Sequence, residues 1–309
     1  MSTTVTTPTP APQFWSPSVW SSIQSQVVAT AGAVRVSQNV FPGPMTPLTG
    51  VTSVPAPHFD FNKMTLTEGI TKPYVELAVE FSLTNGQVQS ETNATAATML
   101  SKFAARDLAL AEDAIILQGR KGANALPPTA RIESGGESLK DGIMGLILPG
   151  NEVIVNAPGP EPTNSGGEIW AAIQDAISRL TDKTQSVPWA LIADTAAFGA
   201  ISGSVLNGNP LCNMLAPGVI AGGICGTPAM PKYTGLFIAL GGDPTTIYVD
   251  TDATMEPTNR GGSGLYFFRV FERVQVVALD PRAFVKLDFS YLAKSTPPNS
   301  TGPAPKSKP

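Results

Sequence analysis

The side chains that could perform chemistry in this 309-residue chain are few and scattered. The one histidine, His58, follows a proline-rich stretch at residues 41–57 and has no cysteine or acidic cluster beside it. A hydrolytic triad needs a base next to its nucleophile. Ser202 lies in AISGS, which is not the GxSxG turn of hydrolases. We therefore expect His58 to be structural, no residue to be catalytic, and the chain not to be an enzyme.

Metal, nucleotide and redox sites are disfavoured by similar reasoning. Cys212 and Cys225 are not spaced as metal ligands, and we expect two free thiols in a reduced cytosol. The glycine-rich segments lack the GxxxxGK[ST] order of a phosphate-binding loop. Glu112 and Asp113 are adjacent, so on a helix they point about 100° apart and do not converge on one proton. We expect these two carboxylates to meet Arg or Lys at a fold or subunit contact, and we expect no metal and no cofactor.

The composition indicates a chain that hides much of its surface against copies of itself. Hydrophobic residues make up 42% and charged residues only 14%, with a net charge of −4. This balance gives no basic footprint, which disfavours nucleic acid as a direct partner. No apolar run approaches the ~18 residues of a membrane span. The N-terminal residues lack the pattern of a signal peptide, so a cytoplasmic location is expected.

One long helix dominates the predicted secondary structure. The segment from Thr92 to Gly119 holds no Pro or internal Gly, Thr92 or Asn93 can cap its start, and Gly119 can end it. One face is apolar, and it consists of Leu100, Ala104, Leu108, Ala111 and Ile115. A second face is charged and predicted to meet water or a neighbouring subunit, and it consists of Lys102, Arg106 and Asp113.

The other predicted elements alternate between helix and strand, as in an α+β protein. A helix starts at Pro17, and its apolar face repeats at Trp20, Ile23, Val27, Ala31 and Val34. An alternating strand at 75–83 leads into Asn85-Gly86, which predicts a tight hairpin turn. The remaining predictions are strands at 143–148 and 153–155, a helix at 168–181, a buried strand at 187–193, a helix after Asp194 that continues to Ile201, and several strands after Gly218.

Four stretches together resemble the encapsulins, bacterial and archaeal nanocompartment shell proteins with the Hong Kong 97 phage-capsid fold. The strongest is AARDLALAEDAIILQG (104–119), followed by DGIMGLI (141–147), with looser support from KPYVELAVEFSL and FFRVFERV. The resemblance implies a disordered tail (1–16), an N-terminal helix and arm (17–72), an extended-loop hairpin (73–92), a spine helix and peripheral domain (93–166), an axial domain (167–260), closing strands (261–292) and a disordered C-terminal tail (293–309).

The resemblance also implies three sets of site residues. Trp20, Ile23 and Val27 would line the groove that receives a cargo peptide. Ser204, Asn207 and Asn209 would line an uncharged five-fold pore. Val79, Phe81, Asn85 and Gly86 would form the arm that crosses onto a neighbouring subunit. Some encapsulins stack a flavin on a Trp at the base of this loop; residues 83–86 are LTNG here, so no flavin is expected.

These features predict a structural protein, the shell subunit of an icosahedral encapsulin nanocompartment. Such a virus-like particle would self-assemble from copies of this chain and enclose a cargo protein that carries a short targeting peptide. A phage or prophage major capsid protein that encloses DNA has the same fold and stays open as an alternative. An oligomeric α+β enzyme is the third reading, and it would need a ligand or metal in a subunit pocket.

Overall fold

The computed structural model describes residues 14–41, 51–61, 63–91, 95–139, 142–159, 164–215, 219–260 and 264–295. Most of both predicted tails and the proposed helix caps Thr92 and Asn93 lie outside these ranges. The helices are α1 (Pro17–Val34), α2 (Ser37–Val40), α3 (Asn85–Gln89), α5 (Ala96–Gln118), α6 (Gly142–Gly145), α7 (Gly167–Thr181), α8 (Thr195–Gly203), α9 (Leu211–Leu215) and α10 (Tyr291–Ser295). Short 3-10 helices are η1 (Gly119–Ala125), η2 (Gly136–Ser138) and η4 (Pro281–Ala283).

The strands form two larger sheets and three small two-stranded pairs. Early strands are β1 (Ser53–Pro55), β2 (His58–Asp60), β3 (Thr65–Thr67), β4 (Thr71–Pro73), β5 (Val75–Thr84), β6 (Ala130–Ser134) and β7 (Glu152–Ile154). Later strands are β8 (Trp189–Ala193), β9 (Val205–Leu206), β10 (Asn209–Pro210), β11 (Ile224–Gly226), β12 (Thr234–Ala239), β13 (Thr245–Arg260), β14 (Leu265–Ala278) and β15 (Phe284–Asp288).

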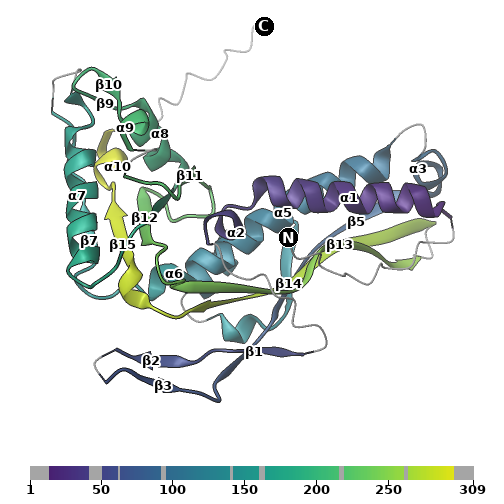
Figure 1. Ribbon diagram of the computed structural model, residues 1–309. Helices are drawn as coiled ribbons and strands as arrows, with labels where there is room; N and C mark the ends of the chain where they lie inside the picture. The colour runs from purple at the N-terminus through teal and green to yellow at the C-terminus, as the bar shows by residue number, and fades with distance from the viewer. Residues whose placement is uncertain are drawn as a thin grey trace, which may run out of the picture.

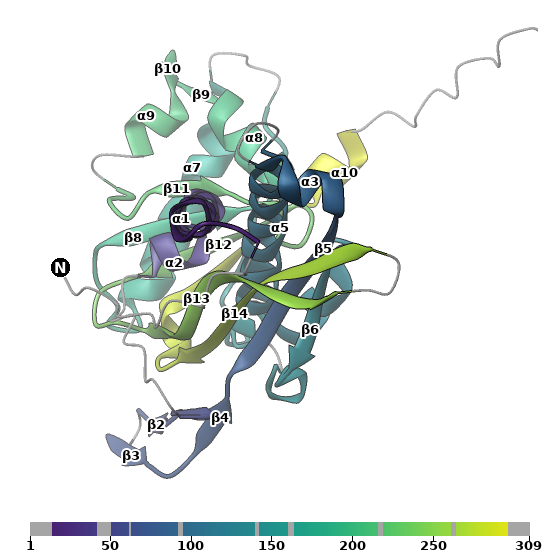
Figure 2. The same ribbon diagram turned by 90° about the vertical axis from the view of Figure 1, so that its right-hand side faces the viewer.

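Two lobes meet at an angle, and a narrow arm projects from their junction (Figure 1). In the first, here called the long-helix lobe, α5 and α1 lie side by side over the antiparallel sheet β13-β14-β5-β6. In the second, here called the α/β lobe, α7, α8 and α9 pack around the mixed sheet β11-β8-β12-β15-β7. Figure 2 looks along α1, with α5 beside it, and shows the four-stranded sheet below α1 and the arm extending away from both lobes.

The predicted long helix is confirmed as α5, and its apolar face lies in the core. Leu108 and Ala111 are fully buried, and Ala104 and Ile115 nearly so. At its start, the buried Glu91 carboxylate accepts the backbone N–H groups of Ala97 (2.6 Å) and Thr98 (2.9 Å), which do not have helical acceptors of their own. At its end, Gly119 takes a φ of 60°, a conformation that costs glycine little.

A second glycine, Gly142, allows α6 to pack closely against the end of α5. Gly142 also has a positive φ of 53°, and a Cβ placed on it would lie 2.2 Å from the backbone nitrogen of Gly119. Only a residue without a side chain allows the start of α6 to approach the end of α5 so closely. The predicted strand at 143–148 is therefore wrong, because this segment begins as the short helix α6 packed on α5.

Strand β8 of the α/β lobe lies between the two hydrophobic cores. All five residues of β8 are buried, as the uniformly apolar sequence predicts. Leu191 packs into the core under α7 and α8, whereas Ala190 and Ile192 face the core that holds α5 and α1. Because each face of β8 belongs to a different core, this strand connects the packing of the two lobes.

The predicted domain boundaries need correction. The sheet of the α/β lobe includes β7 and β15, which lie outside the predicted axial domain at 167–260. Conversely, β13 falls inside that range but pairs with β14 along the long-helix lobe. The chain therefore passes between the lobes several times, which a division into consecutive ranges cannot represent.

Several local predictions are confirmed. The helix from Pro17 is α1, capped by the Ser16 hydroxyl, which accepts the Val19 N–H. The helix at 168–181 is α7, and Ile169, Ile173 and Leu180 on its apolar face are buried. The Asp194 carboxylate caps α8, accepting the N–H of Ala197 at 2.8 Å.

Candidate functional site

The arm that projects from the lobe junction is formed by two short strand pairs, β1 with β4 and β2 with β3. At its base, Val54, Ala56 and Tyr74 pack with Val277 of β14 in a small core. Farther out, the Arg282 guanidinium lies 3.7 Å from the centre of the Phe61 ring, a cation–π contact with the α/β lobe. The arm therefore contacts the long-helix lobe through Val277 and the α/β lobe through Arg282.

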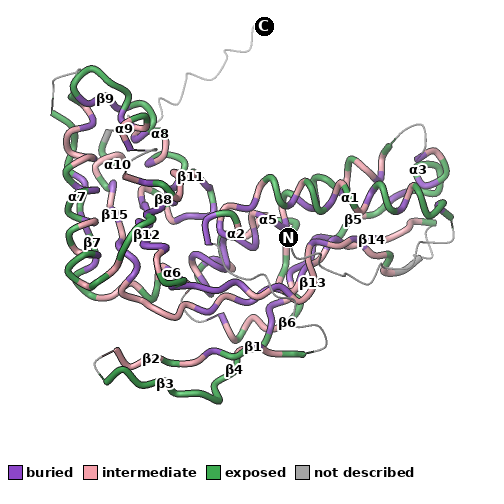
Figure 3. The backbone as a smooth tube through the Cα atoms, viewed as in Figure 1, coloured by how far each residue is buried: buried purple, intermediate pink, exposed green. Residues whose placement is uncertain are grey.

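The outer part of the arm presents apolar side chains that this chain does not cover. Met64 is 78% exposed, Ile70 47% and Leu66 43%, and all of β3 is exposed (Figure 3). A two-stranded hairpin is marginally stable in water unless one face is packed against something else. The geometry of the arm therefore favours contact with a further surface.

The predicted arm at 73–92 is wrong, and so is its hairpin. β5 pairs with β14 on one side and β6 on the other, within the sheet of the long-helix lobe. Val79 is buried and Phe81 stacks on Phe268, so neither can reach a neighbour from a projecting loop. Asn85 and Gly86 begin helix α3 because Thr84 and Gln87 form a capping box.

The three residues predicted to dock cargo are core residues of this chain. Trp20 is 4% exposed, and Ile23 and Val27 are buried more completely in the core of the long-helix lobe. The amphipathic pattern was correctly located, but its apolar face packs on the same subunit. The side of α1 that reaches solvent holds serine, alanine and glycine together with Val28, and the helix contains no charged residue.

The predicted pore residues lie around the small hairpin β9–β10, at the end of the α/β lobe farthest from the arm (Figure 1). Asn207 and Gly208 form its two-residue turn, both with positive φ, and Asn207 and Asn209 are exposed. Ser204 is buried, and its hydroxyl donates to the Ala200 carbonyl at 2.6 Å. Ser204 is thus a wrong choice for a pore lining, while Asn207 and Asn209 stay predictions.

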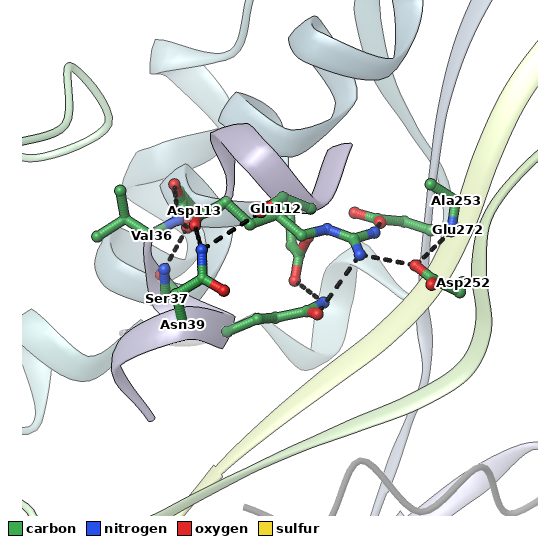
Figure 4. A network of polar contacts seen from close by, with 11 residues as sticks. Val36, Ser37, Asn39, Glu112, Asp113, Asp252, Ala253 and Glu272 are labelled. Carbon is green, nitrogen blue, oxygen red and sulfur yellow. Dashed lines mark hydrogen bonds and ion pairs between the residues drawn. The ribbon is translucent and has the colours of Figure 1, made fainter. Parts of the chain in front are cut away.

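The most unusual chemistry of the described residues lies inside the long-helix lobe, where one arginine meets three carboxylates (Figure 4). Arg35 follows α1 and is 4% exposed. Its Nε lies 2.6 Å from Glu112 of α5, and its Nη1 lies 2.6 Å from Asp252 of β13. Its Nη2 contacts Glu272 of β14. The β13 strand brings Asp252 inward at an irregularity in its pairing with β14, between Thr251 and Thr254.

A fourth carboxylate, Asp113, holds the segment that follows Arg35. Its oxygens accept the backbone N–H groups of Val36 at 3.0 Å and of Ser37 at 2.8 Å. Asp113 is fully buried, so the prediction that it faces water or a neighbouring subunit is wrong. The prediction that Glu112 meets Arg or Lys at a fold contact is confirmed by its ion pair with Arg35.

Burial and mutual repulsion change the acidity of this cluster. Burial, followed by repulsion from Glu272, raises the pKa of Glu112 well above its usual value, although Arg35 acts in the opposite direction. Burial raises the pKa of Glu272 to about 7, against the attraction of Arg35. Burial also raises the pKa of Asp113, and backbone hydrogen bonds from Ser37 and Val36 limit that rise.

Sequence reasoning placed Glu112 and Asp113 correctly on the helix but could not find Arg35 as their partner. The usable signal was the local sequence: two acids stand in AEDAIIL, where every residue from Ala111 to Leu117 is buried. Buried acids need donors or cations. Their partners are separated from them by 74 or more positions in sequence, which no local pattern encodes.

The described residues include no group of three or more His, Cys, Asp or Glu side chains placed to hold a metal ion. Within the same residues, no helix has the length and apolar character needed to cross a membrane. Cys212 and Cys225 are free thiols. His58 lies exposed at the start of β2.

No protein-family model matches the sequence, and no curated protein matches it. Solved structures match over most of the chain. A virus-like particle from Pyrococcus furiosus is 15% identical, covers 87% of this chain and 99% of its own, and gives a TM-score of 0.57. Mycobacterium phage Bobi is 12% identical, with 84% and 89% coverage and a TM-score of 0.53. The capsid of Myoviridae phage XM1 is 13% identical, with 81% and 90% coverage and a TM-score of 0.50. The chain therefore has the α+β Hong Kong 97 fold that is shared by virus-like particles and phage capsids.

Proposed function

We propose that this chain is the shell subunit of an encapsulin nanocompartment, which self-assembles into a closed icosahedral cage in the cytoplasm. The observation that carries the proposal is the projecting arm. Its apolar side chains Met64, Leu66 and Ile70 are exposed on the single chain, and the chain shares its fold with a virus-like particle. A head-to-tail contact, in which the arm of one copy covers a different surface of the next, closes into rings and cages.

The apolar residues of α5 offer a surface of the kind that such an arm could cover. Met99 and Phe103 are 54% and 51% exposed, and they lie four residues apart on the same side of the helix. Fully burying an apolar side chain of this size contributes roughly 1.5–3 kcal/mol. Three arm residues would therefore supply several kcal/mol per contact, repeated at every subunit of the cage.

The proposed content of the cage is a protein that carries a short targeting peptide, and not nucleic acid. Support comes from the net charge of −4 and from the uncharged, solvent-exposed side of α1. Neither provides the cations that bind the phosphates of nucleic acid. A phage or prophage major capsid protein that encloses DNA is the second candidate, favoured by the similarity to phage capsids.

Electron microscopy and mass analysis of the untagged purified protein would test both candidates. Cages that contain one co-purified protein and no DNA would support the nanocompartment, whereas cages filled with DNA would favour the phage capsid. A monomer or small oligomer that turns over a small molecule would refute both candidates.

The role of the arm is tested by a triple variant, Met64→Gln, Leu66→Gln and Ile70→Gln. We expect it to remain folded but to shift from cages to small oligomers in sedimentation experiments. The matched control, Thr65→Gln with Thr67→Gln, places the same side chain on the same exposed strand without removing apolar area. Cage formation by the triple variant at the wild-type yield would contradict the assigned role.

A further inference from the structure

The buried cluster around Arg35 has more acids than its donors can satisfy. One guanidinium faces Glu112, Glu272 and Asp252, and Asp113 stands beside them. Asp252 is 27% exposed and can be hydrated, and Asp113 accepts two backbone N–H groups. Glu112 and Glu272 are the two fully buried acids of the cluster for which no backbone N–H donor is found among the described residues. A buried charge without adequate partners is neutralised by a proton instead.

Each of these two acids has one oxygen with a donor and one without. Glu112 accepts from the Gln38 amide through Oε1, and Glu272 accepts from Arg35 through Oε2. Glu112 Oε2 lies near Arg35 Nε but makes no hydrogen bond with it, and Glu272 Oε1 has no hydrogen-bond partner. The side chains of Glu112 and Glu272 lie within hydrogen-bonding reach of each other. Two carboxyl groups can form such a bond only when one of them is protonated.

We propose that Glu112 and Glu272 share one proton, and that this proton holds a latch between the end of α1 and the body of the lobe which loosens as the pH rises. The latch connects Arg35 and Gln38, on either side of the α1–α2 junction, with α5, β13 and β14. The inference goes beyond the proposed function, because it concerns the single subunit whatever it assembles into.

The charged groups that act most strongly on the pair come from the elements packed around it. They are Arg35 after α1, Asp113 on the same helix as Glu112, and Asp252 on β13. Cys225 on β11 lies within electrostatic range of Asp113 and contributes no charge while it is a thiol. Arg35 is the only cation among these described groups.

The direction of the pH response follows from proton binding. Burial raises the pKa of Glu272 from 4.5 to about 7, so between these values the closed latch keeps a proton that an opened, hydrated latch releases. The stabilisation of the closed latch by this proton is complete below about pH 4.5 and is lost as the pH rises to about 7. The opening equilibrium should therefore increase by up to about tenfold per pH unit in this window and level off above it.

Infrared spectroscopy of the full chain tests the shared proton directly. A protonated carboxyl group has a carbonyl band that a carboxylate lacks, and we expect this band in mildly acidic solution and its loss near neutral pH. Glu272→Gln and Glu112→Gln should each remove it. Absence of the band from the wild-type protein, or its persistence in both variants, would overturn the proposal.

Hydrogen exchange of the segment after α1, corrected for the intrinsic pH dependence of exchange, tests the latch. Protection of residues 35–40 should fall with rising pH in the wild-type protein and stay constant in Glu272→Gln, whose amide imitates the protonated acid. Glu112→Gln provides the same test should Glu272→Gln not fold. The control Glu76→Gln removes a part-exposed acid of β5 that pairs with Arg269, and it should respond as wild type does. Equal pH responses of the wild type and both cluster variants would refute the latch.

Discussion

Removing the guanidinium of Arg35 is the most informative single change, because it separates the buried cluster from the ordinary surface charges. Arg35→Met keeps the length of the side chain but leaves Glu112 and Glu272 without a cation. Breaking a buried ion pair from one side typically costs about 3–5 kcal/mol, since the remaining charge stays out of water. We expect a loss of that size in the free energy of unfolding near neutral pH.

Arg131→Met is the matched control. Arg131 lies on β6 of the same sheet, is 51% exposed, and pairs with Glu80, whose side chain is 40% exposed. Exposed and half-exposed pairs contribute about 0–1 kcal/mol, so a much smaller loss is expected. Urea unfolding of both variants at equal protein concentration, followed by tryptophan fluorescence, measures the difference.

The same variants predict a pH dependence. Without Arg35, the pKa values of Glu112 and Glu272 should rise further, so protonation at lower pH removes part of the cost. The loss caused by Arg35→Met should therefore be smaller at about pH 5 than at about pH 7, while that caused by Arg131→Met should change little. Equal losses for the two variants, or a loss for Arg35→Met that does not depend on pH, would refute the electrostatic reasoning.

Two further predictions concern the ends of helices and can be measured by the same unfolding experiments. Gly142→Ala should destabilise strongly and lower the yield of folded protein, because its Cβ would collide with the backbone at the end of α5, whereas Gly32→Ala on the exposed side of α1 meets no atom and should stabilise by about 0.5–1 kcal/mol. Equal effects of the two alanines would contradict the close approach of α6 to α5. Asp194→Ala should cost about 0.5–2 kcal/mol through loss of the α8 cap, and Asp194→Asn, which can still accept the Ala197 N–H, should recover most of it. A loss as large in Asp194→Asn as in Asp194→Ala would argue against capping.

The Asn-Gly dipeptide occurs in two different structures in this chain, which shows how local context decides a turn. Asn85-Gly86 predicted a hairpin, yet it starts helix α3 because Thr84 and Gln87 supply a capping box. Asn207-Gly208 does form a hairpin turn, between β9 and β10. The sequence TNGQ contains the helix signal three residues apart, so this error was avoidable from the sequence alone.

The arm could not be located by strand propensity. Its strands have three residues each, and their alternation is too short to register against the proline-rich sequence around them. The long alternating strand β5 gave the clearest β signal and was therefore taken for the arm. Its buried face instead packs beneath α5 in the centre of the sheet. The alternation of apolar and polar residues there reflects one face in the core and one face outside it.

Long-range electrostatics were the part least accessible from sequence. The apolar faces of α1, α5 and α7 and the buried strand β8 were predicted from the pattern within each single element. The structure buries most of these apolar positions. The cluster around Arg35 depends on four segments at once, including an irregular part of β13 that turns Asp252 inward. A sequence pattern can show that Glu112 and Asp113 are acids in an apolar stretch. Only the fold shows that a single arginine must serve three buried or half-buried carboxylates, and that excess of acid is what makes a shared proton necessary.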